Sequence, residues 1–302
     1  LFRYLNVNKI NNNIYMTQTK RYYNKKKSTR KKREFDKLIK KKYFYKNPPD
    51  IIKINNYNVL LLPLNNCKSV KVECNIYGGN YLEEKEEGGV AHLLEHILIS
   101  GSKMCKKEKC EILLDRHNID SNASAMEMHT NYYLISIPYN LEFMLKYLTS
   151  AIINPNITKK LLNDEKEAVR NELNMFINNP TWEMYDKMYK AFYKPSGYRM
   201  GADYKHQLAL LDKLNITDMK RFLNKTRIND CLLFTISGKF DRNLIIKFFN
   251  SIPRLKTKDK CKMKLFKPFN HCFALEKKTI FVKSSKFANT NILIYFPIYL
   301  KQ

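Results

Sequence analysis

Two histidines and a glutamate have the clearest capacity for chemistry in this sequence, and they lie together in His92-Leu93-Leu94-Glu95-His96. Histidines four positions apart lie about 40° apart on one face of a helix, so both rings can bind one metal ion. Glu95 falls on the same side, where a carboxylate can take a proton from the attacking water and pass it to the leaving amine. We therefore predict that His92 and His96 are metal ligands and that Glu95 is the general base.

A third ligand has to come from another segment, because a catalytic zinc ion takes three protein ligands and keeps one position open. The predicted helix from Thr158 to Asn178 carries Glu165 and Glu172, which are about two helical turns apart and project from one face. We predict that Glu172 binds the metal and that Glu165 orients a ligand or polarises the catalytic water. The alternative is that both glutamates face solvent on a charged helix.

The elements that must position these residues begin near Asp50 and alternate between strands and helices. The predicted strands are Asn58–Leu62, Val70–Ile76, Asn131–Ile137 and Cys231–Ser237. The predicted helices run from Val90 to a stop at Gly101, over Lys106–Arg116, Leu141–Ile153, Thr158–Asn178, Trp182–Tyr193 and Thr217–Leu223, and onward from Asp241, with Thr158 and Thr217 as N-caps. This order predicts an α+β fold in which helices pack on one face of a mainly antiparallel sheet.

The chain is expected to contain more than this region, because 302 residues, 44% of them hydrophobic, have room for two domains. We predict a basic extension or transit segment over residues 1–49, a zinc-bearing catalytic domain over 50–255, a linker over 256–274, and the start of a second, truncated homologous domain over 275–302. A transit segment predicts the interior of an organelle such as a mitochondrion or plastid. The alternative is a disordered, Lys/Asn-rich extension on a cytoplasmic protein.

The net charge, the apolar runs and the cysteines indicate whether other classes of protein have to be considered. The net charge of +27, from 55 Lys+Arg and 28 Asp+Glu, makes nucleic acid a partner to weigh. The basic residues are spread along the chain without a short recognition motif, so we do not expect nucleic-acid binding. No apolar run approaches the roughly 20 residues that span a bilayer. The seven cysteines include no Cys-x-x-Cys pair, so we expect neither a disulfide framework nor a cysteine zinc site, and predict a reducing compartment.

These residues resemble the pitrilysin family of zinc metallopeptidases, which includes insulysin-type enzymes, the mitochondrial processing peptidase and the plastid stromal processing peptidase. The stretch Gly88–Ser102 is similar to the family's motif helix with its closing Gly-Ser/Thr, and Glu172 follows at about the family's distance for the third ligand. Further similar segments are Ser121–Ser124, which resembles the family's edge strand, Thr130–Tyr133, Gly197–Gly201 and Asn229–Gly238.

The resemblance covers about Asn58 to Pro253 and implies a LuxS/MPP-like metalloenzyme fold with one Zn2+ per chain. It implies the first half of a two-half architecture, whose working unit needs a second homologous half or a partner subunit. The substrate would be an unstructured peptide or presequence, added as a strand along Asn122, Ala123 and Ser124. The alternative for Asn122 is an ordinary strand-end residue.

Two questions stay open at this point. The acidic stretch Glu83–Glu87 could attract a basic presequence, or it could simply form a solvated loop. The chain could also be a non-catalytic scaffold subunit of a processing-peptidase-like complex, although such subunits usually lack part of the zinc set that is complete here. Sensitivity to chelators would separate a zinc enzyme from a basic nucleic-acid-binding protein, whose affinity would collapse with salt.

Overall fold

The computed structural model describes residues 49–254, except residues 65, 106, 127, 193–202 and 227–230. Almost all of the predicted extension (1–49), the linker (256–274), the second domain (275–302) and the similar segment Gly197–Gly201 lie outside the described residues. Within the described part, no helix is both long enough and apolar enough to cross a membrane.

A six-stranded sheet with the order β1-β2-β6-β3-β5-β4 forms the centre of the fold. The strands are β1 (Asp50–Ile54), β2 (Tyr57–Pro63), β3 (Val70–Tyr77), β4 (Asp120–Ala125), β5 (His129–Ser136) and β6 (Leu232–Gly238). Strands β2 and β6 are parallel and every other neighbouring pair is antiparallel. The predicted α+β class with a mainly antiparallel sheet is therefore confirmed.

Period-two alternation in the central strands explains which face of the sheet is buried. In β3, Val70, Val72 and Cys74 are fully buried, whereas the residues between them are only partly buried and point to the other face. Phe234 of β6 extends the same buried face and contacts the ring of Phe249, with centroids 5.1 Å apart. Burial of this continuous apolar face against helices provides the main driving force for the fold.

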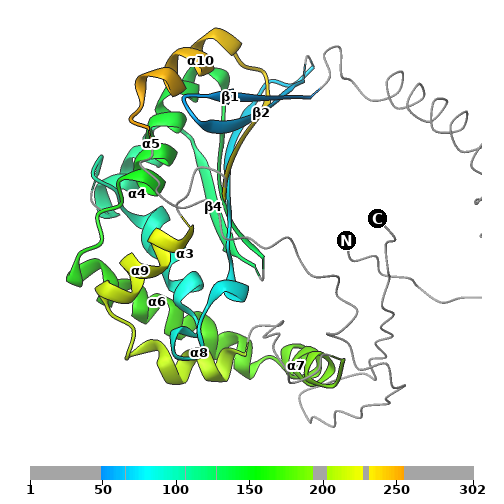
Figure 1. Ribbon diagram of the computed structural model, residues 1–302, viewed down its shortest axis with the longest axis vertical. Helices are drawn as coiled ribbons and strands as arrows, with labels where there is room; N and C mark the ends of the chain where they lie inside the picture. The colour runs from blue at the N-terminus through cyan, green and yellow to red at the C-terminus, as the bar shows by residue number, and fades with distance from the viewer. Residues whose placement is uncertain are drawn as a thin grey trace, which may run out of the picture.

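The helices are α3 (Val90–Ser100), α4 (Lys107–Arg116), α5 (Leu141–Ile153), α6 (Lys159–Asn178), α7 (Pro180–Phe192), α8 (Tyr204–Leu211), α9 (Ile216–Thr226) and α10 (Arg242–Ser251). In the part of the chain that the structure describes, three short 3₁₀ helices accompany them: η2 (Asn80–Leu82), η3 (Lys85–Glu87) and η4 (Pro138–Asn140). Figure 1 shows α3, α4 and α5 along one side of the sheet, with α6 and α9 packed outside α3. The prediction that helices cover one face is therefore confirmed.

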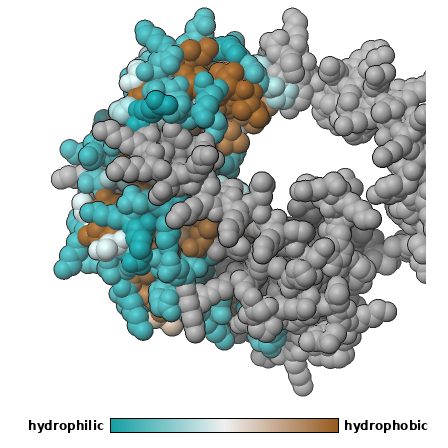
Figure 2. All heavy atoms as spheres, viewed as in Figure 1, coloured by the Kyte–Doolittle hydropathy of each residue, from teal (hydrophilic) through white to brown (hydrophobic). Residues whose placement is uncertain are grey.

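One strand and one α-helix were not predicted. Strand β1 forms a hairpin with β2 through Asn55 and Asn56, both at positive φ (47° and 71°), which is the backbone conformation of a tight hairpin turn. Its Ile51 is 68% exposed, and Figure 2 shows hydrophobic residues gathered on the surface near this end of the sheet. Helix α8 was also missed, although Tyr204, Leu208 and Leu211 follow helical spacing and pack on the core.

The predicted N-cap at Thr158 is confirmed, because its hydroxyl accepts a hydrogen bond from Leu161 N–H (3.1 Å). The predicted cap at Thr217 is wrong, because α9 already begins at Ile216. The side chain of Asn215 accepts hydrogen bonds from the N–H of Thr217 (2.8 Å) and of the residue after it. Asparagine caps a helix at least as well as threonine, and the earlier residue caps α9 here.

The expectation that the cysteines do not pair is also wrong. Cys105 and Cys110 form a disulfide, with Cα atoms 5.4 Å apart. The turn before α4 brings the two residues together, and a count of cysteines and Cys-x-x-Cys spacings does not detect such a contact. The reducing compartment that was inferred from unpaired cysteines therefore loses its basis.

Candidate metal centre

Helix α3, which carries both motif histidines, is fixed at its first turn by a glycine and a glutamate. Gly89 has a φ of 90°, a conformation that glycine adopts without steric cost, and a Cβ there would lie 3.2 Å from the Gln207 side chain. The Glu83 carboxylate accepts hydrogen bonds from the N–H of Gly89 (3.0 Å) and of Ala91 (2.9 Å). These bonds satisfy N–H groups that a helix start leaves unpaired, and they place a negative charge at the positive end of the helix dipole.

The acidic stretch that contains Glu83 is therefore not a simple solvated loop. Glu83 caps α3, and Glu87 is only 2% exposed and pairs with Arg221 of α9. Glu84 and Glu86 are exposed, so any attraction of a basic peptide rests on these two residues.

The two histidines and the predicted third ligand meet at one point. The Nε2 atoms of His92 and His96 each lie 3.2 Å from Oε2 of Glu172. Among the described residues, these three side chains form the one group of potential ligands whose donor atoms all lie within 4.8 Å of one another. Ligand atoms bound tetrahedrally to zinc at 2.0–2.1 Å are about 3.3 Å apart, so the donor set fits a zinc ion.

Glu165 lies on the outer side of this group, as its spacing from Glu172 predicts. Its Oε2 is 3.4 Å from Nδ1 of His96, and its side chain is 2% exposed. The alternative that both glutamates face solvent is therefore wrong. A carboxylate at Nδ1 favours the tautomer that leaves Nε2 free to bind a metal, which is the arrangement expected of an orienting residue.

Glu95 lies beside the metal-binding group and is largely buried (7% exposed). Its Oε2 is 4.0 Å from Nε2 of His96. Burial raises the pKa of Glu95 and outweighs the opposing effect of the positive charges of His96 and His92. A carboxyl whose pKa is raised toward neutrality is better suited to exchange a proton with a reactant.

The contacts of the two histidines with Glu165 and Glu172 also shift the pKa values of the ligands. Burial lowers the pKa of His96, but hydrogen bonds to Glu165 and Glu172 outweigh this effect and raise it to about 10. Hydrogen bonds from His92 and His96 hold the pKa of Glu172 far below its usual value. The site thus keeps Glu172 ionised as a ligand under all ordinary conditions.

A cavity of about 520 Å³ joins the metal-binding group to the predicted substrate strand. His92, Glu95, His96 and Glu172 line one part of it, and β4 lines another. Strand β4 is the last strand of the sheet order and pairs only with β5 among the described strands, so no other described strand covers its outer edge. The structure therefore brings Asn122, Ala123 and Ser124 to the same cavity as the histidines.

Sequence reasoning missed the aromatic wall of this cavity. Phe176 and Tyr204 line it and stack on each other, with ring centroids 4.8 Å apart. Trp182 packs against both rings. Phe176 could have been found, since it lies one helical turn after Glu172 on α6, but Tyr204 belongs to the unpredicted helix α8.

Comparison with known proteins agrees with this geometry. Residues 59–200 match the family model described as Insulinase (Peptidase family M16). This region of the chain belongs to the insulinase family of peptidases. This finding confirms the resemblance to the pitrilysin and insulysin group of enzymes.

Among curated relatives, the chain is 30% identical over 113 residues to an uncharacterized zinc protease, YmfH, of Bacillus subtilis, covering 37% of this chain and 25% of that protein. It is 19% identical over 193 residues to the beta subunit of the mitochondrial-processing peptidase of Saccharomyces cerevisiae, covering 63% and 41%. The chain thus spans less than half of the length of these relatives.

Two solved structures have a similar fold. A protease from Helicobacter pylori superposes with a TM-score of 0.62 at 21% identity, covering 70% of this chain and 52% of that one. A peptidase M16 inactive domain from Pseudomonas fluorescens superposes with a TM-score of 0.60 at 15% identity, covering 71% and 53%. Since this family fold occurs in an inactive domain as well as in a protease, the side chains of the site have to carry the functional argument.

Proposed function

We propose that this chain is the zinc-bearing half of a metalloendopeptidase that hydrolyses unstructured peptides or presequences. The observation that carries the proposal is the convergence of His92, His96 and Glu172, with the buried Glu95 beside them, in a cavity bordered by an open strand edge. A second half, as a further domain or a partner subunit, would complete the working unit, since the chain spans about half of the similar solved structures.

Each side chain has a distinct part in the proposed reaction. His92, His96 and Glu172 would hold one zinc ion, which when bound would polarise the scissile carbonyl and lower the pKa of water. Glu95 takes a proton from the attacking water and delivers it to the leaving amine. Glu165 holds the ring of His96 in place through Nδ1.

Strand β4 would bind the substrate through its main chain. A peptide added along Asn122, Ala123 and Ser124 gains backbone hydrogen bonds that make little demand on its sequence. This mode of binding requires an extended segment, so an unstructured peptide fits and a folded domain does not. The basic residues 1–49 support an organelle interior as the place where such peptides are met.

A non-catalytic scaffold subunit is the second candidate, since the similar structure from Pseudomonas fluorescens is an inactive domain. The retained ligand set and Glu95 favour the enzyme, because a scaffold has no need of a buried general base. Nucleic-acid binding through the charge of +27 is the third candidate and predicts an affinity that falls steeply with salt.

The test is cleavage of an unstructured fluorogenic peptide by the full chain, alone and with its second half or partner supplied. We compare the wild type, the wild type with a zinc chelator, Glu95→Gln, and Glu167→Gln as a control, since the Glu167 side chain is 69% exposed on the same helix as Glu172. Activity that is lost with chelator and in Glu95→Gln, while bound zinc remains in Glu95→Gln, supports the enzyme. Zinc binding without cleavage under any of these conditions supports the scaffold subunit instead.

A further inference from the structure

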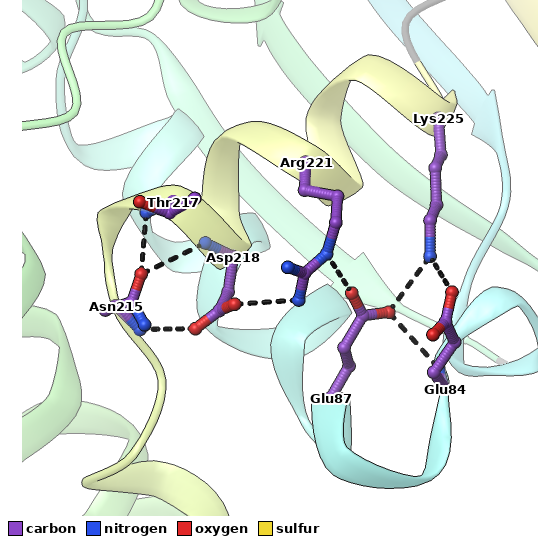
Figure 3. Close-up of polar contacts among 7 residues, drawn as sticks. All are labelled: Glu84, Glu87, Asn215, Thr217, Asp218, Arg221 and Lys225. Carbon is purple, nitrogen blue, oxygen red and sulfur yellow. Dashed lines mark hydrogen bonds and ion pairs between the residues drawn. The ribbon is translucent and has the colours of Figure 1, made fainter.

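A network of charged side chains ties α9 to the segment that precedes the metal-binding helix (Figure 3). Its centre is Glu87 of η3, whose side chain is only 3% exposed. The Glu87 carboxylate accepts hydrogen bonds from Nε of Arg221 (2.7 Å), from Nζ of Lys225 (3.2 Å) and from the N–H of Glu84 (3.2 Å). Lys225 also donates to Oε1 of Glu84 (2.7 Å), so Glu87 and the N-cap residue of η3 are both held by one helix.

Arg221 is itself held in place from the other side. Its Nη2 donates to Oδ1 of Asp218 (2.7 Å), one turn earlier on α9. The other oxygen of Asp218 accepts a hydrogen bond from the N–H of Asn215 (2.9 Å), at the start of the helix. Figure 3 shows these contacts as one continuous chain from the first turn of α9 to η3. The guanidinium group is therefore oriented before it meets Glu87.

The anchored segment leads directly into the metal-binding helix. Glu87 is followed by two glycines and then by α3, so His92 lies five positions after Glu87. The backbone between them is tightly packed, since a Cβ on Gly88 would lie 2.8 Å from the ring of His206. A displacement of Glu87 is transmitted along this short, crowded segment to the first turn of α3.

Because Glu87 is buried, the loss of its contact with α9 would cost free energy. Without Arg221, Oε1 of Glu87 loses this hydrogen-bond donor while Oε2 keeps Lys225, so part of the desolvation cost is left uncompensated and the segment is drawn toward water. Ion pairs between exposed side chains lack this property and contribute little. Asp50 and Arg242 form such a pair at the far end of the sheet, where α10 contacts β1, also at 2.7 Å.

We propose that Glu87 and Arg221 are positioning residues for the metal centre. They hold α3 in the place and rotation at which the Nε2 atoms of His92 and His96 converge on Glu172. This inference rests on the proposed zinc site. It adds that zinc binding depends on contacts from α9, a helix that supplies no ligand.

The experiment compares Arg221→Met with Arg242→Met in the full chain. Both arginine side chains are 49% exposed and both donate to a carboxylate at 2.7 Å, but only the partner of Arg221 is linked to α3. Zinc affinity is measured by competition with a chelating dye, well below the unfolding temperature. The absorption spectrum of the Co2+-substituted protein reports ligand geometry independently of activity.

We expect Arg221→Met to weaken zinc binding about tenfold, the lower end of what is lost when groups that orient metal ligands are replaced. The cobalt spectrum should change in the same variant, and Arg242→Met should match the wild type in both measurements. Arg221→Lys should recover most of the affinity, because it restores the second positive charge beside Glu87, next to that of Lys225. Glu87→Gln should weaken zinc binding in the same direction, and Arg221→Met decides the matter if Glu87→Gln does not fold.

Two results would overturn the inference in different ways. If Arg221→Met lowers the unfolding temperature but leaves the zinc affinity and cobalt spectrum unchanged, the network is a structural contact only. If the wild-type protein itself binds no zinc, the proposed function fails and takes this inference with it.

Discussion

Replacing Glu165 by glutamine removes a buried negative charge from the outer side of the metal centre and leaves the size of the side chain unchanged. The carboxylate lies 3.4 Å from Nδ1 of His96 and is 2% exposed, so solvent cannot replace it. Loss of a carboxylate behind a metal-binding histidine reduces metal affinity by about 10- to 100-fold. Because the contact with His96 is longer than an ordinary charged hydrogen bond, we expect the lower end, about tenfold or about 1.4 kcal/mol.

The assay is a competition titration of zinc against a chelator of known affinity, with Glu167→Gln as the matched control. Glu167 lies on the same helix, two positions away, but its side chain is 69% exposed and pairs with Arg170. The control should bind zinc as the wild type does. Equal zinc affinity in Glu165→Gln and Glu167→Gln would refute the idea that Glu165 orients His96, and the pair would then be an incidental contact.

Three further predictions concern stability. Phe249→Ala should lower the free energy of unfolding by about 3–5 kcal/mol in urea denaturation, since Phe249 is fully buried. The control Tyr139→Ala, at an 88% exposed position, should lower it by less than about 0.5 kcal/mol. Equal losses in the two variants would contradict the assigned core. Cys105→Ser should cost about 2 kcal/mol, the entropy of closing a short loop, and with reductant present the wild type and the variant should be equally stable. In chelator-treated protein, hydrogen bonds to Glu165 and Glu172 outweigh the effect of burial and raise the pKa of His96 from 6.5 to about 10. The contribution of protonated His96 to folding stability is therefore fully present below pH 6.5 and is lost as the pH rises through about 10. The difference in melting temperature between wild type and His96→Gln should shrink over that range, and a constant difference would contradict the raised pKa.

The part of the fold that positions the site could be predicted because its pattern is local. Alternation in β3 and the apolar spacing of α3 directly reflect burial on one face. The placement of Glu165 and Glu172 on one face of α6 likewise followed from their spacing. Each of these inferences needs only neighbours within about two helical turns.

The missed features depend on contacts between distant segments. Glu87 becomes buried because its partner Arg221 comes 134 residues later, and no local signal marks that pairing. Helix α8 packs on α6, but it has only eight residues, so its apolar stripe spans two turns and gives a weak local signal. The Cys105–Cys110 disulfide depends on the conformation of one turn, which cysteine spacing does not specify.

The open edge of β4 also bears on how this protein avoids self-association. A strand with unpaired backbone groups can pair with the same strand of another molecule and so begin aggregation. The sequence of β4, Asp120-Ser121-Asn122-Ala123-Ser124-Ala125, contains no β-branched, aromatic or long apolar residue. Two such strands would gain main-chain hydrogen bonds but almost no side-chain packing, and stable cross-β assembly needs both. The edge that would bind a peptide in the proposed function therefore offers a second copy of the same strand little to pack against.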